Sequence, residues 1–203
     1  MGSKPKRARI AIIGDIDASM AKDACSAIID IVQKTHRDEF FKVQIDISSE
    51  GGSINHGAAI LGFLNQLKAQ RPKCKIITVA TGHVCSEAVR TFLVGDYRIA
   101  YEHSLFVIHD GYFEGPQSVT TESVKYYHAR INIDNDQLRH IIKLRCGQQA
   151  LDMYEQVRVS RQDWVVKPGL ARMAGICHRV VPSFKGDHYA RRQQEFRDLH
   201  PGY

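Results

Sequence analysis

Three short segments carry residues whose types could support acyl transfer: the glycine pair Gly51 and Gly52, the serine Ser86 and the histidine His109. A serine hydroxyl becomes a nucleophile when a base lies within hydrogen-bond reach, and an imidazole titrates close to neutral pH. Consecutive glycines let the backbone turn sharply and approach a substrate with no Cβ atom in the way. Together the segments predict a serine nucleophile, a histidine base and a backbone oxyanion hole.

Each of these residues also has a simpler structural explanation. A serine before a helix is commonly an N-cap, a Gly-Gly pair after a strand is commonly a turn, and a histidine at a strand end is commonly a hydrogen-bonded polar residue. The catalytic interpretation is favoured because all three segments follow apolar runs typical of strands. The carboxyl ends of parallel strands meet at one edge of an α/β sheet, where they form a crevice.

The elements that must position these residues alternate between strand and helix patterns. Apolar runs predict strands at residues 9–14, 43–47, 76–80, 105–108 and 176–181. Apolar residues at helical spacing predict helices at 19–33, around 60–67, at 86–93 and at about 121–145, with a further short helix opened by Pro168. Such βα units in series predict an α/β fold with a mostly parallel sheet and right-handed crossovers.

Length, composition and charge narrow the class of protein. The 203 residues, of which 43% are apolar, are enough for one sizeable core and predict a single domain. The net charge of +6 gathers near the two ends, so we expect solvated arms and no nucleic-acid partner. No apolar run is long enough for a bilayer and the first residues do not resemble a signal peptide, so we expect a cytoplasmic protein with no membrane partner.

The five cysteines are scattered without any CxxC spacing. This pattern suggests neither a disulfide framework nor a zinc site, and we expect no metal and no cofactor. Cys85 directly precedes Ser86, which makes a cysteine nucleophile a minor alternative. Its side chain should point away from the crevice if Ser86 points in, so we interpret Cys85 as a packing residue.

In their order and spacing the motifs resemble those of the Clp protease proteolytic subunit family, serine peptidases of the ClpP/crotonase superfamily. The similarity extends from about Arg9 to Pro182, and the segments that carry it are RIAIIG (9–14), ISSEGGSI (47–54), GHVCS (82–86), GDYRIA (95–100), VIH (107–109), KPGLA (167–171) and GICHRVV (175–181). The resemblance implies a ClpP/crotonase spiral in a single domain at 9–182, with a protruding handle at about 111–146. A basic arm at 1–8 and a charged tail at 183–203 would flank it.

The resemblance also implies roles for individual residues. Ser86 corresponds to the nucleophile, His109 to the base, and the amides of Gly52 and Glu87 to the oxyanion donors. The chain departs from the family pattern with Glu50 in place of a proline and Glu87 in place of the usual methionine. Two carboxylates near a developing oxyanion would oppose it, and we expect Arg90, three residues after Glu87, to neutralise this charge.

The third catalytic residue of the family is an aspartate, and here the chain departs again. Alignment places Arg158 at that position, or Gln156 if the length difference is placed later, and neither is an acid. The carboxylates nearby are Asp152, Glu155 and Asp163, and the sequence does not choose among them. Loss of the acid from a triad slows catalysis by orders of magnitude without abolishing it.

By resemblance, the function is hydrolysis of peptide bonds in peptides or unfolded proteins inside a ring-shaped homo-oligomeric chamber. Tyr112 and Phe113 in the handle would otherwise be exposed, so we expect self-association through this segment. Only eight residues precede the first strand, which argues against pairing with an unfoldase ring. Two alternatives stay open: a catalytically impaired homologue that serves as a structural ring component, and a crotonase-type acyl-CoA enzyme, which needs no serine or histidine at these places.

Overall fold

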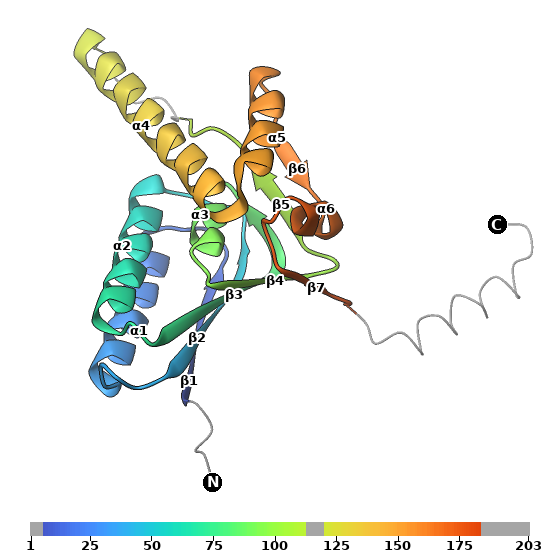
Figure 1. The fold of residues 1–203 in the computed structure, drawn as a ribbon. Coiled ribbons are helices and arrows are strands. Elements are labelled where there is room, and N and C mark those ends of the chain that lie inside the picture. Colours follow the sequence, from blue (N-terminus) through green and yellow to red (C-terminus); the bar gives the residue numbers. More distant parts are fainter. Residues whose placement is uncertain (1–5, 113–119, 184–203) are drawn as a thin grey trace, which may run out of the picture.

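The structure is a computed structural model that describes residues 6–112 and 120–183 (Figure 1). Its seven-stranded sheet has a main path in the order β1-β2-β3-β4-β7, and every pair along this path is parallel. These strands are β1 (Lys6–Ile13), β2 (Phe41–Ser49), β3 (Cys74–Cys85), β4 (Tyr97–Tyr101) and β7 (Arg179–Val181). The predicted α/β class with a mostly parallel sheet is confirmed.

Six helices connect the strands of the described residues. They are α1 (Ala18–Lys34), α2 (Ile54–Gln70), α3 (Glu87–Leu93), α4 (Thr121–Cys146), α5 (Gln148–Val159) and α6 (Pro168–Met173). The long helix α4 projects away from the sheet, while α1 and α2 lie together beside β1 and β2 (Figure 1). None of the helices in the described ranges is both long and apolar enough to span a bilayer.

The apolar spacing that predicted these elements matches what they bury. Val43, Ile45 and Ile47 of β2 are at most 1% exposed, and Leu64 and Leu67 of α2 are fully buried in the same core. Helix α4 matches the helix predicted at about 121–145, and its Leu138 and Ile142 are buried. Phe113, which we predicted at an oligomer contact, lies outside the described residues.

Strand β3 changes its neighbour part-way along its length, and this change positions the site. Residues 77–80 pair with 97–100 of β4, whereas residues 83–85 pair with 105–107 of β5 (Leu105–Ile108). The strand predicted at 76–80 extends to Cys85, because residues 83–85 find backbone partners in β5. Ser86 and His109 follow β3 and β5 directly, so the pairing brings them to one edge of the sheet.

Three elements have no counterpart in the prediction. They are β4, helix α5 and the three-residue strand β6 (Trp164–Val166), which pairs with β5 in the antiparallel direction. In addition, β7 begins at Arg179, later than the predicted 176. β4 carries Arg98 among its five residues and β6 has only three residues, so neither contains an apolar run as long as that of β5, and their pairing defines them.

Candidate active site

Ser86 occupies the sharp turn between β3 and α3. Its backbone angles are φ 53° and ψ −123°, a positive φ that side-chain-bearing residues rarely adopt. The turn is held by two hydrogen bonds: the Ser86 amide donates to the Val107 carbonyl at 2.8 Å, and the Ser86 carbonyl accepts from the Val89 amide at 3.0 Å. Backbone strain of this kind costs about 1–3 kcal/mol and gathers at functional sites. Nucleophilic serines on strand-to-helix elbows share this feature.

One cavity of about 380 Å³ is lined by Ser86, His109 and Gly52, together with Glu50 and Tyr112. The structure therefore brings together three of the residues singled out in the sequence. Within the described residues no hydrogen bond joins the Ser86 hydroxyl to the imidazole of His109. Catalytic hydrogen bonds are often long in the absence of substrate and tighten when substrate binds.

The Gly51–Gly52 turn lies against Ser86 and can take no side chain. A Cβ atom on Gly51 would lie 2.6 Å from the Cβ of Ser86, and one on Gly52 would lie 2.7 Å from the Ile16 carbonyl oxygen. Ile16 accepts the Ser53 amide and donates its own amide to the Gly51 carbonyl. These two hydrogen bonds form a parallel bridge in which Gly52 lies between the bonded residues Gly51 and Ser53, and in such a bridge the amide of the middle residue points to the opposite side of the strand. The Gly52 amide is therefore directed away from Ile16.

Glu87 directly follows Ser86, and its carboxyl group is buried away from the cavity. As the first residue of α3 it has an amide without an intrahelical acceptor. Its side chain is 3% exposed and lies against Gly57 of α2, with Oε2 3.4 Å from Nε of Arg90. Burial raises the pKa of Glu87 to about 7 despite the opposing charge of Arg90. The expected pairing of Arg90 with Glu87 is confirmed.

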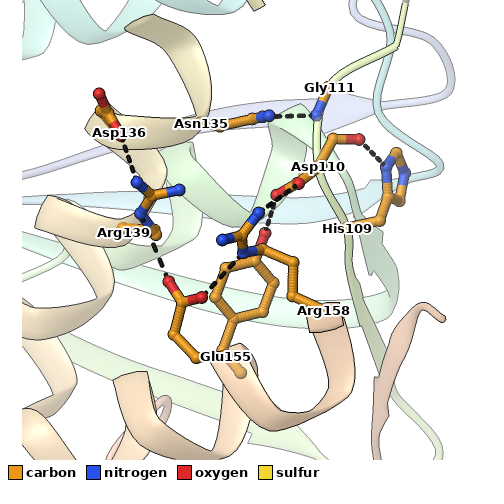
Figure 2. A network of polar contacts seen from close by, with 9 residues as sticks. His109, Asp110, Gly111, Asn135, Asp136, Arg139, Glu155 and Arg158 are labelled. Atoms are coloured by element: carbon orange, nitrogen blue, oxygen red, sulfur yellow. Dashed lines mark hydrogen bonds and ion pairs between the residues drawn. The ribbon is translucent and has the colours of Figure 1, made fainter. Parts of the chain in front are cut away.

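The ring of His109 is held by the backbone of the next residue. Nδ1 of His109 lies 2.7 Å from the carbonyl oxygen of Asp110 (Figure 2). A carbonyl oxygen only accepts hydrogen bonds, so Nδ1 carries the hydrogen and the Nε2 of the neutral ring is left as an acceptor. This is the tautomer that a general base for Ser86 requires.

A polar network fixes Asp110 from behind. Its carboxylate accepts a hydrogen bond of 2.6 Å from the Tyr154 hydroxyl and one of 3.2 Å from Nη1 of Arg158. Arg158 also donates to Glu155 at 2.8 Å, and Arg139 lies 3.4 Å from the same carboxylate (Figure 2). Through this network α5 anchors the loop that carries the partner of His109.

The sequence profile described as Clp protease matches residues 4–183. The chain belongs to the Clp protease family. A ClpP1 point mutant from Listeria monocytogenes has a similar structure, with a TM-score of 0.67 at 20% sequence identity over 86% of this chain and 91% of that one. No curated protein matches the sequence. The resemblance found in the motifs is thus confirmed, and so is the ClpP-like fold.

The three carboxylates considered for the acid of this Clp protease lie in different surroundings. Asp152 is exposed and accepts a hydrogen bond of 2.8 Å from Gln148. Glu155 is engaged by Arg158 and Arg139, and the exposed Asp163 lines a neighbouring cavity of about 440 Å³ that His109 also lines. In the described part of the chain none of the three makes a hydrogen bond to His109. The hydrogen-bond acceptor of His109 is instead the backbone carbonyl of Asp110. Every residue has such a carbonyl, so the sequence could not reveal this partner.

Glu50, which replaces the family's proline, lies exposed at the rim of the cavity. Its Oε1 is 2.6 Å from Nδ1 of His83, and hydrogen bonds from Cys85 and His83 lower the pKa of its carboxyl group. Cys85 is 5% exposed, and its burial beside Glu50 raises its pKa to about 12. A thiol that keeps its proton is a poor nucleophile, which argues against the alternative of a Cys85 nucleophile.

Proposed function

We propose that this Clp protease is a serine endopeptidase that cleaves peptide bonds through an acyl-enzyme at Ser86. The observation that carries the proposal is the cavity that Ser86, His109 and Gly52 line together, with Ser86 in a strained backbone conformation. The fixed tautomer of His109 supports the same assignment.

In the proposed reaction His109 takes the proton of the Ser86 hydroxyl through Nε2 as the oxygen attacks the substrate carbonyl. The amides of Gly52 and Glu87 stabilise the negative charge that develops on the carbonyl oxygen. The imidazolium then gives its proton to the leaving amine, and water hydrolyses the acyl-enzyme in a second, equivalent cycle. The buried Glu87 carboxyl does not line the cavity, so it opposes the oxyanion less than its place in the sequence suggests.

The Asp110 carbonyl takes one of the two roles of a triad aspartate. It holds the ring in the required tautomer, and loss of that tautomer costs a triad enzyme about 10⁴-fold in kcat. It carries no full negative charge, so it stabilises the imidazolium less than a carboxylate would. We therefore expect an active peptidase that is slower than one with a complete triad.

We also propose that the chain acts as a homo-oligomeric ring, in the cytoplasm, on peptides or unfolded proteins. The projecting helix α4 supports self-association, because Val124, Tyr126 and Ile133 are between 51% and 59% exposed on it and Tyr112 nearby is 69% exposed. Exposed apolar groups of this size commonly mark interaction surfaces. Light scattering should show that Tyr126→Asp reduces the mass of the assembly, and an unchanged mass would exclude this surface.

A fluorophosphonate probe tests the nucleophile directly. We expect the purified protein to be labelled at Ser86, as located by mass spectrometry of the peptides, and Ser86→Ala to abolish the labelling. Ser53→Ala is the matched control, since Ser53 lines the same cavity and should leave the labelling intact. Circular dichroism establishes that each variant is folded. Equal labelling of wild type and Ser86→Ala would contradict the proposal.

A catalytically impaired ring component is the second candidate function. It is favoured by the absence, in the described residues, of a carboxylate bonded to His109 and of a hydrogen bond between Ser86 and His109. Assembly without any labelling of the folded wild-type protein would select this candidate.

A further inference from the structure

A cluster of three unlike donor groups lies beside the candidate active site. The carboxylate of Glu50, the imidazole of His83 and the thiol of Cys85 each place one ligand atom within 4.8 Å of the other two. His83 and Cys85 are two residues apart on β3, so their side chains leave the strand on the same side. Glu50 reaches them from the end of β2, 33 positions before His83.

The spacing of these atoms is close to that of a metal site. Ligands at about 2.0–2.3 Å from a tetrahedral ion lie about 3.3–3.8 Å from one another. Oε1 of Glu50 and Nδ1 of His83 are 2.6 Å apart, and the three ligand atoms all lie within 4.8 Å of one another. Side-chain rotations that shift these atoms by about 1 Å would therefore bring them to the spacing of a tetrahedral site. The side chains of Glu50 and His83 are 67% and 54% exposed, which leaves the cluster open to an ion from solvent.

We propose that Glu50, His83 and Cys85 form a binding site for a divalent transition metal ion, with Zn²⁺ as the best fit. An oxygen, a nitrogen and a sulfur donor suit this borderline-soft ion, whereas Mg²⁺ and Ca²⁺ prefer oxygen donors alone. Three protein ligands leave the fourth position to water. On binding, the thiol of Cys85 passes its proton to solvent and the thiolate bonds to the metal.

The site has a direct structural link to the oxyanion hole. Glu50 immediately precedes the Gly51–Gly52 turn, and Cys85 immediately precedes Ser86. A bound ion would tie these two segments together and would neutralise the only carboxylate that lines the cavity among the described residues. The inference concerns metal binding and does not depend on the proposed peptidase activity.

Titration calorimetry of the metal-free full chain with ZnCl₂ tests the site. We expect one Zn²⁺ per chain, and at least tenfold weaker binding for each of Cys85→Ser, His83→Ala and Glu50→Gln. The Co²⁺-loaded wild-type protein should show a thiolate-to-metal charge-transfer band that Cys85→Ser lacks. The exposed positions 50 and 83 keep the test decisive if the buried Cys85→Ser variant fails to fold.

Three control variants separate this site from adventitious binding and from catalysis. Cys146→Ser removes another partly accessible thiol and His103→Ala another exposed imidazole, and both should bind Zn²⁺ as the wild type does. Ser86→Ala should also keep full affinity, even though it would abolish labelling by the fluorophosphonate. Absence of binding, or equal affinity in wild type and the three ligand variants, would overturn the inference.

Discussion

The imidazole of His109 donates its Nδ1 hydrogen to the main-chain carbonyl of Asp110, 2.7 Å away, and it is the side chain of Asp110 that Tyr154 and Arg158 hold. Arg158, one of the two residues that alignment places at the family's catalytic aspartate, contacts the loop after His109. The orientation of the candidate base depends on a backbone group and on the network that fixes it. We therefore expect Asp110 to position the proposed base.

Removal of the Asp110 side chain should slow the reaction without changing the nucleophile. In Asp110→Ala the loop loses both anchors, and a displacement of about 1 Å at the base costs up to 100-fold in rate, so we expect kcat to fall about 10- to 100-fold. Asp110→Asn keeps an acceptor for the Tyr154 hydroxyl and should lose less. Steady-state hydrolysis of a fluorogenic peptide measures both variants. A kcat equal to that of the wild type in Asp110→Ala would show that the network does not position His109.

A methyl group on Gly51 should damage the site through crowding. Gly51 has φ +103° and a Cβ there would lie 2.6 Å from Ser86, whereas Gly147 has a similar φ of +98° with no atom within 4 Å of the added Cβ. Gly51→Ala should therefore cost about 1–3 kcal/mol more in free energy of unfolding than Gly147→Ala. It should also abolish fluorophosphonate labelling, whereas Gly147→Ala should not. Urea denaturation and labelling measure the two effects, and equal losses in both variants would point to backbone strain alone.

The close approach of α2 to Glu87 predicts a compensating pair of substitutions. A Cβ on Gly57 would lie between 2.2 and 2.5 Å from the Glu87 side chain, so Gly57→Ala should destabilise the protein by about 1–3 kcal/mol. Gly62 lies in the same helix with open space around it, and Gly62→Ala should stabilise by up to about 1 kcal/mol. In a Glu87→Ala background the space is free and Gly57→Ala should behave like Gly62→Ala. Thermal denaturation of Gly57→Ala, Glu87→Ala, the double variant and the Gly62→Ala control measures these effects. If the effects of Gly57→Ala and Glu87→Ala simply add in the double variant, the contact is refuted.

The Asp96–Lys68 pair predicts a loss of stability in acid. Burial raises the pKa of Asp96, but hydrogen bonds from Lys68 at 2.7 Å and from the Ile76 amide at 2.8 Å lower it more, so the net shift is downward. Asp96 therefore holds its proton less tightly in the folded state than in the unfolded state. Its stabilising contribution to the free energy of unfolding is fully present above the ordinary pKa of an aspartate. It is lost as the pH falls through the folded pKa.

The substitution Lys68→Met should therefore lower the free energy of unfolding at pH 7 by about 1 kcal/mol and flatten its decline below pH 4. The matched control is Lys34→Met, which breaks the much more exposed Lys34–Asp30 pair and should change stability by only a few tenths of a kcal/mol, about the value typical of surface pairs. Denaturant titrations across this pH range measure both variants. A Lys68→Met curve parallel to that of the wild type would rule out the coupling.

The sequence by itself determined the class of fold, most of the helices and strands, and the residues on which the proposed chemistry rests. Periodicity of 2 or 3.6 is a local property, so β2, α1, α2 and α4 could be predicted from their own residues. Ser86, His109 and the Gly51–Gly52 turn could be recognised because each follows the end of a predicted strand and has a residue type that suits acyl transfer. Helix α5 and the short strands β4 and β6 were missed, since their patterns are weak without the neighbours that they pack against.

Only the tertiary structure decided how these residues meet. The division of β3 between β4 and β5 brings Ser86 and His109 together, yet backbone pairing between distant segments leaves no local pattern. The two glutamates that depart from the family pattern also lie in different surroundings: Glu87 lies inward against Gly57, whereas the exposed Glu50 lies beside His83 and Cys85. The direction of a side chain depends on the space and the partners that other segments provide, and for that reason these contacts required the folded chain.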